Sequence, residues 1–258
     1  MTDELFSVVG KIVLVTGGTS GIGNMIAQGF VSRGARTYIT GRDLARTQEA
    51  AAKLAASGGE CIGLAADLTA SDGPKELIDQ LKALETKLDV LVNNAGGNAK
   101  GPIADTTPDD WDFVMELNVR APFFLIQQAL PLLRAAASPE RHATIINVGS
   151  IGGLHIPNWE AHPYNTSKAA VHHMTRSLGK KLGADQIRVN AIAPGPFPSG
   201  MTDTSLESVQ KSIATYVPVG RAGTPEDAQG ACIFLASRAG AYVNGSVIPL
   251  DGGYIGSL

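Results

Sequence analysis

The side chains best suited to chemistry are the phenol of Tyr164 and the ammonium of Lys168, which stand four residues apart. Apolar residues follow them at helical spacing, so the pair is predicted to share one face of a helix, about one turn apart. A phenol alone titrates near pH ~10, and a neighbouring cation favours the phenolate, so such a pair can transfer a proton near neutral pH. A surface tyrosine and a solvated lysine can have the same spacing by chance. The motifs upstream distinguish a catalytic pair from such a surface pair.

The composition is that of an ordinary globular protein, with 258 residues of which 44% are apolar and 17% charged. The formal net charge of -3 and the scattered basic residues argue against nucleic acid or a membrane surface as partner and favour a small molecule. Cys61 and Cys232 form neither a metal-binding spacing nor a disulfide framework, which fits a reduced, cytoplasmic setting. No export signal and no apolar run of about 18 residues is present, so a membrane span is not expected.

Short apolar segments alternate with longer helical patterns along the chain, which is typical of βαβ units. We therefore expect an α/β protein in which helices cover both faces of one doubly wound, seven-stranded parallel sheet. No linker, charge run or repeat divides the chain, so residues 1–258 are expected to form a single domain. Ligands bind such sheets at the carboxyl ends of the strands. The predicted strands are 12–15, 37–40, 61–65, 90–92, 144–148, 189–192 and 247–250.

A glycine-rich segment follows the first predicted strand and precedes a helical pattern. Glycines at this place permit a tight turn and a close approach of the backbone to a pyrophosphate at the helix N-terminus. A glycine-rich loop alone is weak support, but its position between strand and helix favours a dinucleotide site. The predicted contacts are Gly17, Thr19, Ser20, Gly21, Ile22 and Gly23.

The end of the second predicted strand indicates which nicotinamide cofactor is bound. An NAD site usually has a carboxylate here, whereas the 2'-phosphate of NADP needs a cation. Gly41 is followed by Arg42, so Arg42 is our candidate for the 2'-phosphate and NADP(H) is the expected cofactor; a solvated arginine is the alternative. Asp43 is expected to cap the next helix. Beyond the third strand, Asp67-Leu68 either contacts the adenine or belongs to the start of the following helix.

Three further segments place polar groups at strand ends or inside a helix. Asn94-Ala95-Gly96 ends the fourth strand and either passes close to the cofactor or forms a plain turn. Asn118 interrupts an apolar helical pattern, and its amide needs partners as a satisfied core group or as a catalytic one. Ser150 ends the fifth strand, where its hydroxyl is well placed to donate to a substrate oxygen.

Together with Pro194-Gly195, these motifs resemble the short-chain dehydrogenase/reductase family over nearly the whole chain. The resemblance implies a Rossmann fold and reversible hydride transfer between a nicotinamide and a carbonyl carbon. It implies that Tyr164 is the general acid or base and that Lys168 lowers the phenol pKa and holds the ribose. Ser150 would donate to the oxyanion, and Asn118 would position a water and the lysine head. It also implies that the backbone of Pro194, Gly195 and Phe197 contacts the nicotinamide carboxamide.

The favoured activity is NADPH-dependent reduction of a 3-oxoacyl thioester or a similar β-keto compound. The alternatives are a sugar, polyol or steroid alcohol dehydrogenase and, in another class, a catalytically idle nucleotide sensor. The complete tetrad argues against the sensor. The segments 228–236 and 247–253 resemble a family pairing surface, so a homotetramer or homodimer is expected.

The substrate pocket is the least determined part. Residues 201–216 are either a lid over the substrate or an ordinary surface helix. Phe197, Met201, Ile213 and Tyr216 either line a pocket for an acyl chain or pack in the core. The loop 152–162 is about one residue longer than the family resemblance implies, and its histidines, His155 and His162, are expected to be wall or surface groups rather than bases.

Overall fold

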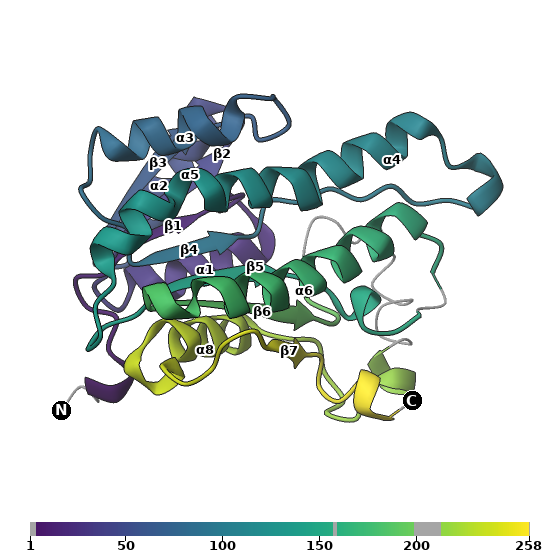
Figure 1. Cartoon of the computed structure of the whole chain (residues 1–258). Helices are drawn as coiled ribbons and strands as arrows, with labels where there is room; N and C mark the ends of the chain where they lie inside the picture. Colours follow the sequence, from purple (N-terminus) through teal and green to yellow (C-terminus); the bar gives the residue numbers. More distant parts are fainter. Residues whose placement is uncertain (1–3, 157–158, 199–212, 258) are drawn as a thin grey trace.

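The computed structural model describes residues 4–156, 159–198 and 213–257. A sheet of seven parallel strands, in the order β3-β2-β1-β4-β5-β6-β7, lies between two layers of helices (Figure 1). The fold class and all seven predicted strands are confirmed, and the strand order reverses between β1 and β4, where such sheets bind ligands. The strands are β1 (Ile12–Val15), β2 (Arg36–Gly41), β3 (Glu60–Ala65), β4 (Val90–Asn93), β5 (Ala143–Val148), β6 (Ile187–Pro194) and β7 (Val247–Leu250).

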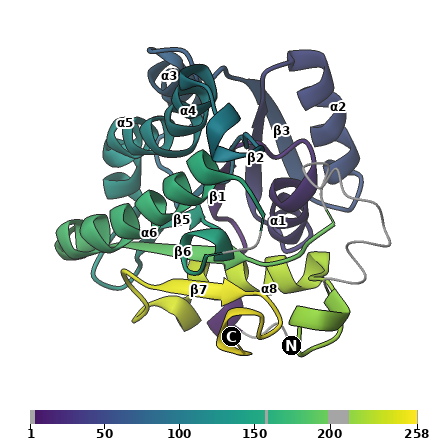
Figure 2. The same ribbon diagram turned by 90° about the vertical axis from the view of Figure 1, so that its right-hand side faces the viewer.

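Helices cover both faces of the sheet (Figure 2). One layer holds α1 (Gly21–Val31), α2 (Leu44–Ala55) and α8 (Pro225–Ala236), and the other holds α3 (Gly73–Lys82), α5 (Ala121–Ala136) and α6 (His162–Leu182). Helix α4 (Pro108–Met115) runs into α5 through a π-helical turn, Glu116–Arg120. Short 3-10 turns lie at Glu4–Phe6, Ile103–Asp105, Ile151–Gly153, Gly183–Asp185, Arg238–Gly240 and Ile255–Ser257.

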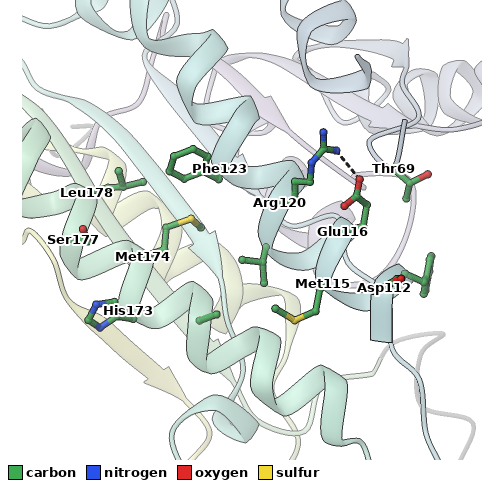
Figure 3. Close-up of a pocket in the computed structure, with 13 residues that line it drawn as sticks. Thr69, Asp112, Met115, Glu116, Arg120, Phe123, His173, Met174, Ser177 and Leu178 are labelled. Atoms are coloured by element: carbon green, nitrogen blue, oxygen red, sulfur yellow. Dashed lines mark hydrogen bonds and ion pairs between the residues drawn. The ribbon is translucent and has the colours of Figure 1, made fainter. Parts of the chain in front are cut away.

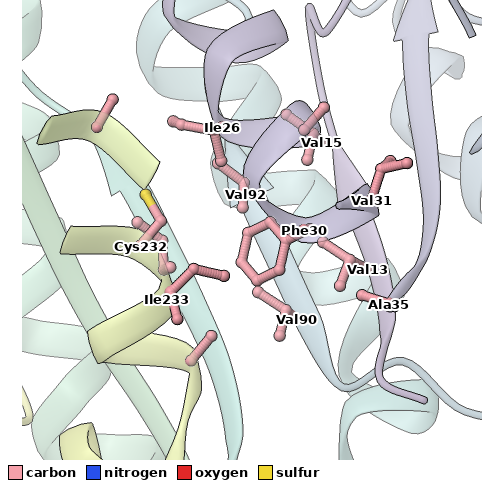
Figure 4. Packing of buried hydrophobic residues seen from close by; sticks show 14 of the residues in the cluster. Val13, Val15, Ile26, Phe30, Val31, Ala35, Val90, Val92, Cys232 and Ile233 are labelled. Carbon is pink, nitrogen blue, oxygen red and sulfur yellow. The ribbon is translucent and has the colours of Figure 1, made fainter. Parts of the chain in front are cut away.

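The sheet is buried on both faces, which explains why its strands are continuous apolar runs rather than alternating ones. Val13 and Val15 face the cluster built on α1 and α8, whereas Ile12 and Leu14 face the one built on α3 and α5. Figure 4 shows the first cluster, with Phe30 seated among the strand valines. Each position of β1 is therefore occupied by a side chain that contributes to one core or the other.

The helix ends show which polar side chains serve only the fold. Asp43 caps α2 as predicted, since its carboxylate accepts from the backbone N–H of Arg46 at 2.9 Å. Asp72 stands at the N-cap of α3 but makes no capping hydrogen bond through its side chain. Cys232 is buried in the core, and this burial raises the pKa of its thiol to about 12. None of the described helices is both long and apolar enough to cross a membrane.

Candidate active site

The glycine-rich loop between β1 and α1 is tied to the end of β4 by Asn94. Its side-chain amide donates to the carbonyl oxygens of Thr16 and Gly17 at 2.9 and 3.0 Å. The Thr16 hydroxyl in turn accepts from the backbone N–H groups of Asn94 and Ala95, each at 3.0 Å. A Cβ on Gly23 would overlap both Asn94 and the Gly17 carbonyl, so only glycine fits there. Asn94 is therefore an anchor for the loop and more than part of a plain turn.

The N-terminus of α1 has the features of an anion site. Gly17 and Gly21 have φ angles of 64° and 56°, in the left-handed region that suits glycine. Ser20 is the exposed N-cap, its side chain makes no capping hydrogen bond, and the first turn carries no acidic side chain. The positive end of the helix dipole is therefore not offset by a carboxylate from the helix's own first turn. The Ile22 side chain is partly buried against the core cluster built on α1 and α8.

Arg42 and Asp67 lie near each other because β2 and β3 are paired in parallel up to Gly41 and Ala65. Arg42 is exposed, and its guanidinium is one of the groups that lower the pKa of Asp67. The largest cause is Thr69, whose hydroxyl and backbone N–H donate to one oxygen of that carboxylate at 2.7 and 3.0 Å. Asp67 thus organises its own turn. Leu68 is buried in the core, so a cofactor contact there would have to use its backbone.

Tyr164 and Lys168 share one face of α6, as predicted. The Lys168 ammonium lies 5.4 Å from the centre of the Tyr164 ring and donates to the Val148 carbonyl at 2.8 Å. Ser150 follows β5, and its side chain is one of the groups that act on the Tyr164 phenol, whose pKa it lowers. The structure therefore brings the three predicted groups together at the carboxyl end of the central strand β5.

Burial controls the acidity of this pair. It raises the pKa of the Tyr164 phenol, and the hydrogen bond from Ser150 opposes the rise without cancelling it. Burial also lowers the pKa of Lys168 to about 8. The net shift is upward because the phenolate loses hydration, and Lys168 is not among the groups that cause it, so the lowering of the phenol pKa by the lysine stays a prediction. The phenol is consequently protonated at neutral pH.

Asn118 lies in the π-helical turn between α4 and α5, and only 2% of it is exposed. Its amide donates to the Gly97 carbonyl and the Ser167 hydroxyl, both at 2.9 Å, and accepts from the Gly97 N–H at 2.8 Å. A Cβ on Gly96 would lie 3.1 Å from the Asn118 amide oxygen and 3.6 Å from the Lys168 nitrogen. Asn118 is thus a satisfied amide beside the lysine; no described hydrogen bond joins the two.

The segment after β6 is held against β7. The Gly195 N–H donates to the Leu250 carbonyl at 2.9 Å, and a Cβ on Gly195 would lie only 2.9 Å from the Asp251 Cα. Phe197 is 6% exposed and belongs to the core cluster, with its ring packed over Gly223. Of the two roles considered for Phe197, lining an acyl-chain pocket or packing in the core, the structure shows core packing. The burial of Phe197 leaves the backbone of residues 194–197 as the part predicted to face the cofactor.

Aromatic side chains from distant parts of the chain pack together beside the turn that follows Ser150. Tyr254 packs against His155 and Tyr216, with ring centres 5.7 and 5.6 Å apart, and Ile213 packs on the same small cluster. Sequence reasoning did not find Tyr254, because nothing local indicates that the C-terminal turn reaches the loop after Ser150. Met201 and most of the predicted lid lie outside the described residues.

His155 lies in the loop after Ser150, and His162 is the first residue of α6. The Nε2 atoms of His155 and His162 are both buried and have no hydrogen-bond partner among the described residues. Neither is joined by a described hydrogen bond to Ser150 or Tyr164, so the structure offers no support for either as a base.

A surface groove lies apart from the four tetrad residues. It is a groove of about 1000 Å³ between α4–α5 and α6 (Figure 3). Arg120 and Glu116 form an ion pair at 2.6 Å on its border, and apolar side chains make up much of its lining. No member of the tetrad lines the groove, so its size does not make it the reaction site. The apolar lining includes Phe113, Met115, Val119, Phe123, Met174 and Leu178.

Comparisons with known proteins agree with this geometry. A family model described as enoyl-(acyl carrier protein) reductase matches residues 17–255. The rhamnolipids biosynthesis 3-oxoacyl-(acyl-carrier-protein) reductase of Pseudomonas aeruginosa is 44% identical over 251 residues, covering 96% of this chain and 98% of that protein. The 2-dehydro-3-deoxy-D-gluconate 5-dehydrogenase of Dickeya dadantii is 34% identical over 256 residues, covering 97% of each.

Solved structures give the same result. The Pseudomonas aeruginosa RhlG/NADP active-site complex superposes with a TM-score of 0.94 at 43% identity, covering 98% of this chain and 99% of that one. At this level of identity the likeness extends beyond the fold, and the residues of the site can be interpreted within one family.

Proposed function

Because the chain belongs to the short-chain dehydrogenase/reductase family, we propose that it uses NADPH to reduce a 3-oxoacyl thioester or a similar β-keto compound. It is an oxidoreductase that acts on the CH–OH/C=O pair. The observation that carries the proposal is the Lys168 ammonium 5.4 Å from the centre of the Tyr164 ring, with the Ser150 hydroxyl near enough to lower the pKa of the phenol. The P. aeruginosa relative supports the substrate class.

The residues present fit NADP(H). The N-terminus of α1 offers backbone N–H groups that no side-chain cap occupies and the Ser20 hydroxyl for a pyrophosphate, and Arg42 offers an exposed guanidinium for the 2'-phosphate. The Asp67 carboxylate, which accepts from Thr69 and from the backbone N–H of Ala70, can also accept from an adenine amino group. We assign the remaining cofactor contacts to Gly17, Thr19, Gly21, Ile22, Gly23, Leu68, Asn94, Ala95, Gly96, Pro194, Gly195 and Phe197, in addition to Tyr164 and Lys168.

The chain's own groups then do the following. Bound NADPH supplies a hydride to the carbonyl carbon. Ser150 donates a hydrogen bond to the oxygen as negative charge develops there, and Tyr164 gives that oxygen its proton. The Lys168 ammonium places a positive charge close to the Tyr164 phenol. Asn118 holds the loop after β4 against α6 through Gly97 and Ser167.

The raised pKa of Tyr164 is compatible with the general-acid role that we propose for reduction. A general acid has to carry its proton before the reaction, and a buried phenol with a raised pKa does so at neutral pH. Oxidation would need the phenolate, which burial disfavours. The second candidate activity, oxidation of a sugar or polyol, is supported by the D. dadantii relative rather than by this site.

Domain, assembly and location follow as further proposals. We propose one catalytic domain over residues 1–258, since the glycine loop and Ser150 follow strands of one sheet and the helix that carries Tyr164 and Lys168 packs on the same sheet. We propose a homotetramer or homodimer, supported by exposed apolar side chains such as Trp111 and Phe124 on α4–α5. The two free cysteines support a cytoplasmic location. Light scattering of the purified protein and cell fractionation test the last two.

A substrate panel tests the activity. NADPH or NADH absorbance is followed with acetoacetyl thioesters, cyclic ketones and sugars, and the thioesters with NADPH are expected to react fastest. If no compound oxidises NADPH although the cofactor binds tightly, the protein is a sensor. The Tyr164→Phe variant should lose turnover by a factor of about 100 or more while binding NADPH normally. Tyr242→Phe, at a fully exposed phenol, is the matched control; turnover by Tyr164→Phe at the control's rate would overturn the acid role.

A further inference from the structure

Helix α6 meets the end of β5 through a buried polar ridge. Lys168, His172 and Thr175 occupy positions i, i+4 and i+7 on one face, and none is more than 5% exposed. Lys168 donates to the Val148 carbonyl at 2.8 Å, and the Thr175 hydroxyl accepts from the Asn147 amide at 2.9 Å. The register between the helix and the strand is thus set by directed hydrogen bonds rather than by apolar contacts alone.

His172 is the middle contact of this ridge and reaches the turn that carries Ser150. The Ser150 N–H donates to His172 Nε2 at 3.5 Å, and His172 Nδ1 lies 3.3 Å from the Gly153 carbonyl oxygen. A ring nitrogen that accepts carries no proton, so the proton is on Nδ1, which donates to Gly153. The imidazole is therefore neutral and bridges the two ends of the turn. Its burial, which lowers the pKa to about 4, is consistent with this state.

Gly149 and Gly153 lie so close to the His172 ring that a side chain at either position would overlap it. A Cβ on Gly149 would overlap His172 Nε2. A Cβ on Gly153 would lie 2.9 Å from His172 Cε1 and 2.6 Å from the Lys168 carbonyl carbon. The backbone from Gly149 to Gly153 thus rests directly on the imidazole and on the helix turn of Lys168. A shift of the ring has to shift the backbone that carries the Ser150 hydroxyl.

We propose that His172 is a positioning residue for the reaction: its imidazole holds the Ser150 turn where the serine hydroxyl meets the Tyr164 phenol. The inference rests on the proposed function, since it takes Ser150 and Tyr164 as catalytic. His172 itself touches the turn and not the phenol among the described contacts. Its effect should therefore appear in the chemical step and not in cofactor binding.

Three variants separate the two hydrogen bonds. His172→Phe keeps the volume of the ring and loses both bonds, so kcat should fall about 10-fold or more, while the KM and the dissociation constant for NADPH change less than about twofold. His172→Gln places an acceptor near the Nε2 position and should restore most of kcat. His172→Asn places a donor near the Nδ1 position only and should not. If the phenylalanine variant does not fold, the comparison of glutamine with asparagine decides.

His142→Phe is the matched control, because His142 is also a buried histidine but lies at the opposite end of β5. It should lower the melting temperature without changing kcat. The proposal is overturned if the three His172 variants keep the wild-type kcat, or if glutamine restores no more activity than asparagine. It is also overturned if every loss of kcat is matched by an equal loss of NADPH affinity.

A spectroscopic measurement separates this inference from the proposed function. Nitrogen-15 NMR of the imidazole reports which ring nitrogen carries the proton, whether or not any substrate reacts. If the wild type reduces no carbonyl compound while Nδ1 carries the proton, the proposed function fails and the arrangement of the turn stands. If the wild type turns over substrate while Nε2 carries the proton, the positioning role of His172 fails alone.

Discussion

Acid should unfold this protein through two histidines that are buried in the neutral form. His142 and His172 are 6% and 1% exposed, and burial lowers the pKa of each to about 4. The charged neighbours act in the same direction, with Lys11 and Arg188 near His142 and Lys168 near His172; Arg176 also faces the latter. Backbone carbonyls oppose the shift without reversing it.

The change of the unfolding free energy with pH follows from the difference in histidine pKa between the folded and unfolded states. An unfolded histidine titrates near pH ~6.5, so between about pH 6.5 and 4 the unfolded chain binds a proton that the folded chain does not. Stability is therefore fully present above the unfolded pKa and is lost as the pH falls through this window. Between pH 7 and pH 5 the loss is about 2 kcal/mol for each histidine, or about 4 kcal/mol together. That is a large part of a typical unfolding free energy of about 5–15 kcal/mol.

Urea unfolding between pH 7 and pH 5 measures this loss. The midpoint should fall steadily over the window, with about two protons taken up on unfolding near pH 5. His142→Phe should remove about half of the pH dependence while leaving the other half. Carboxylates such as Asp67 and Asp110, whose pKa values are lowered, contribute mainly at lower pH. A midpoint that does not change between pH 7 and pH 5 would refute the neutral buried state of both histidines.

Three further predictions concern the cofactor and the lysine. Arg42→Ala should raise the KM for NADPH about 10-fold or more and leave that for NADH nearly unchanged, because a guanidinium matches a phosphate; equal effects would contradict the assignment. Gly23→Ala should weaken NADPH binding, measured by fluorescence, because its Cβ overlaps Asn94 and Gly17. Finally, kcat/KM for reduction should fall above about pH 8 as Lys168 loses its proton, and Lys168→Arg should move this limb to higher pH.

Much of the fold was predictable because its signals are local. A strand buried on both faces is a short apolar run, and all seven such runs became strands of the sheet. Asp43 caps α2 through a hydrogen bond to a residue only three positions later. The spacing of Tyr164 and Lys168 on one helix face follows from the period of the α-helix. Each of these features depends on residues within one or two turns.

Other features were decided by contacts between distant residues. Phe197 packs in the core, and Tyr254 reaches the loop after Ser150, because β6, β7 and the C-terminal turn meet at one edge of the sheet. The role of His172 depends on how closely α6 approaches Gly149 and Gly153. None of these contacts has a local signature, since the partners are far apart along the chain.

The sequence by itself determined which chemical groups are present, their order and the elements that carry them: a phenol, an ammonium, a hydroxyl and a glycine loop on a parallel sheet. Only the tertiary structure decided their protonation. Burial raises the pKa of Tyr164, opposite to what the neighbouring cation predicts, and lowers that of Lys168 and His172. The physical reason is that hydration of a charge is lost according to how much water the whole fold excludes, and no stretch of neighbouring residues specifies that quantity.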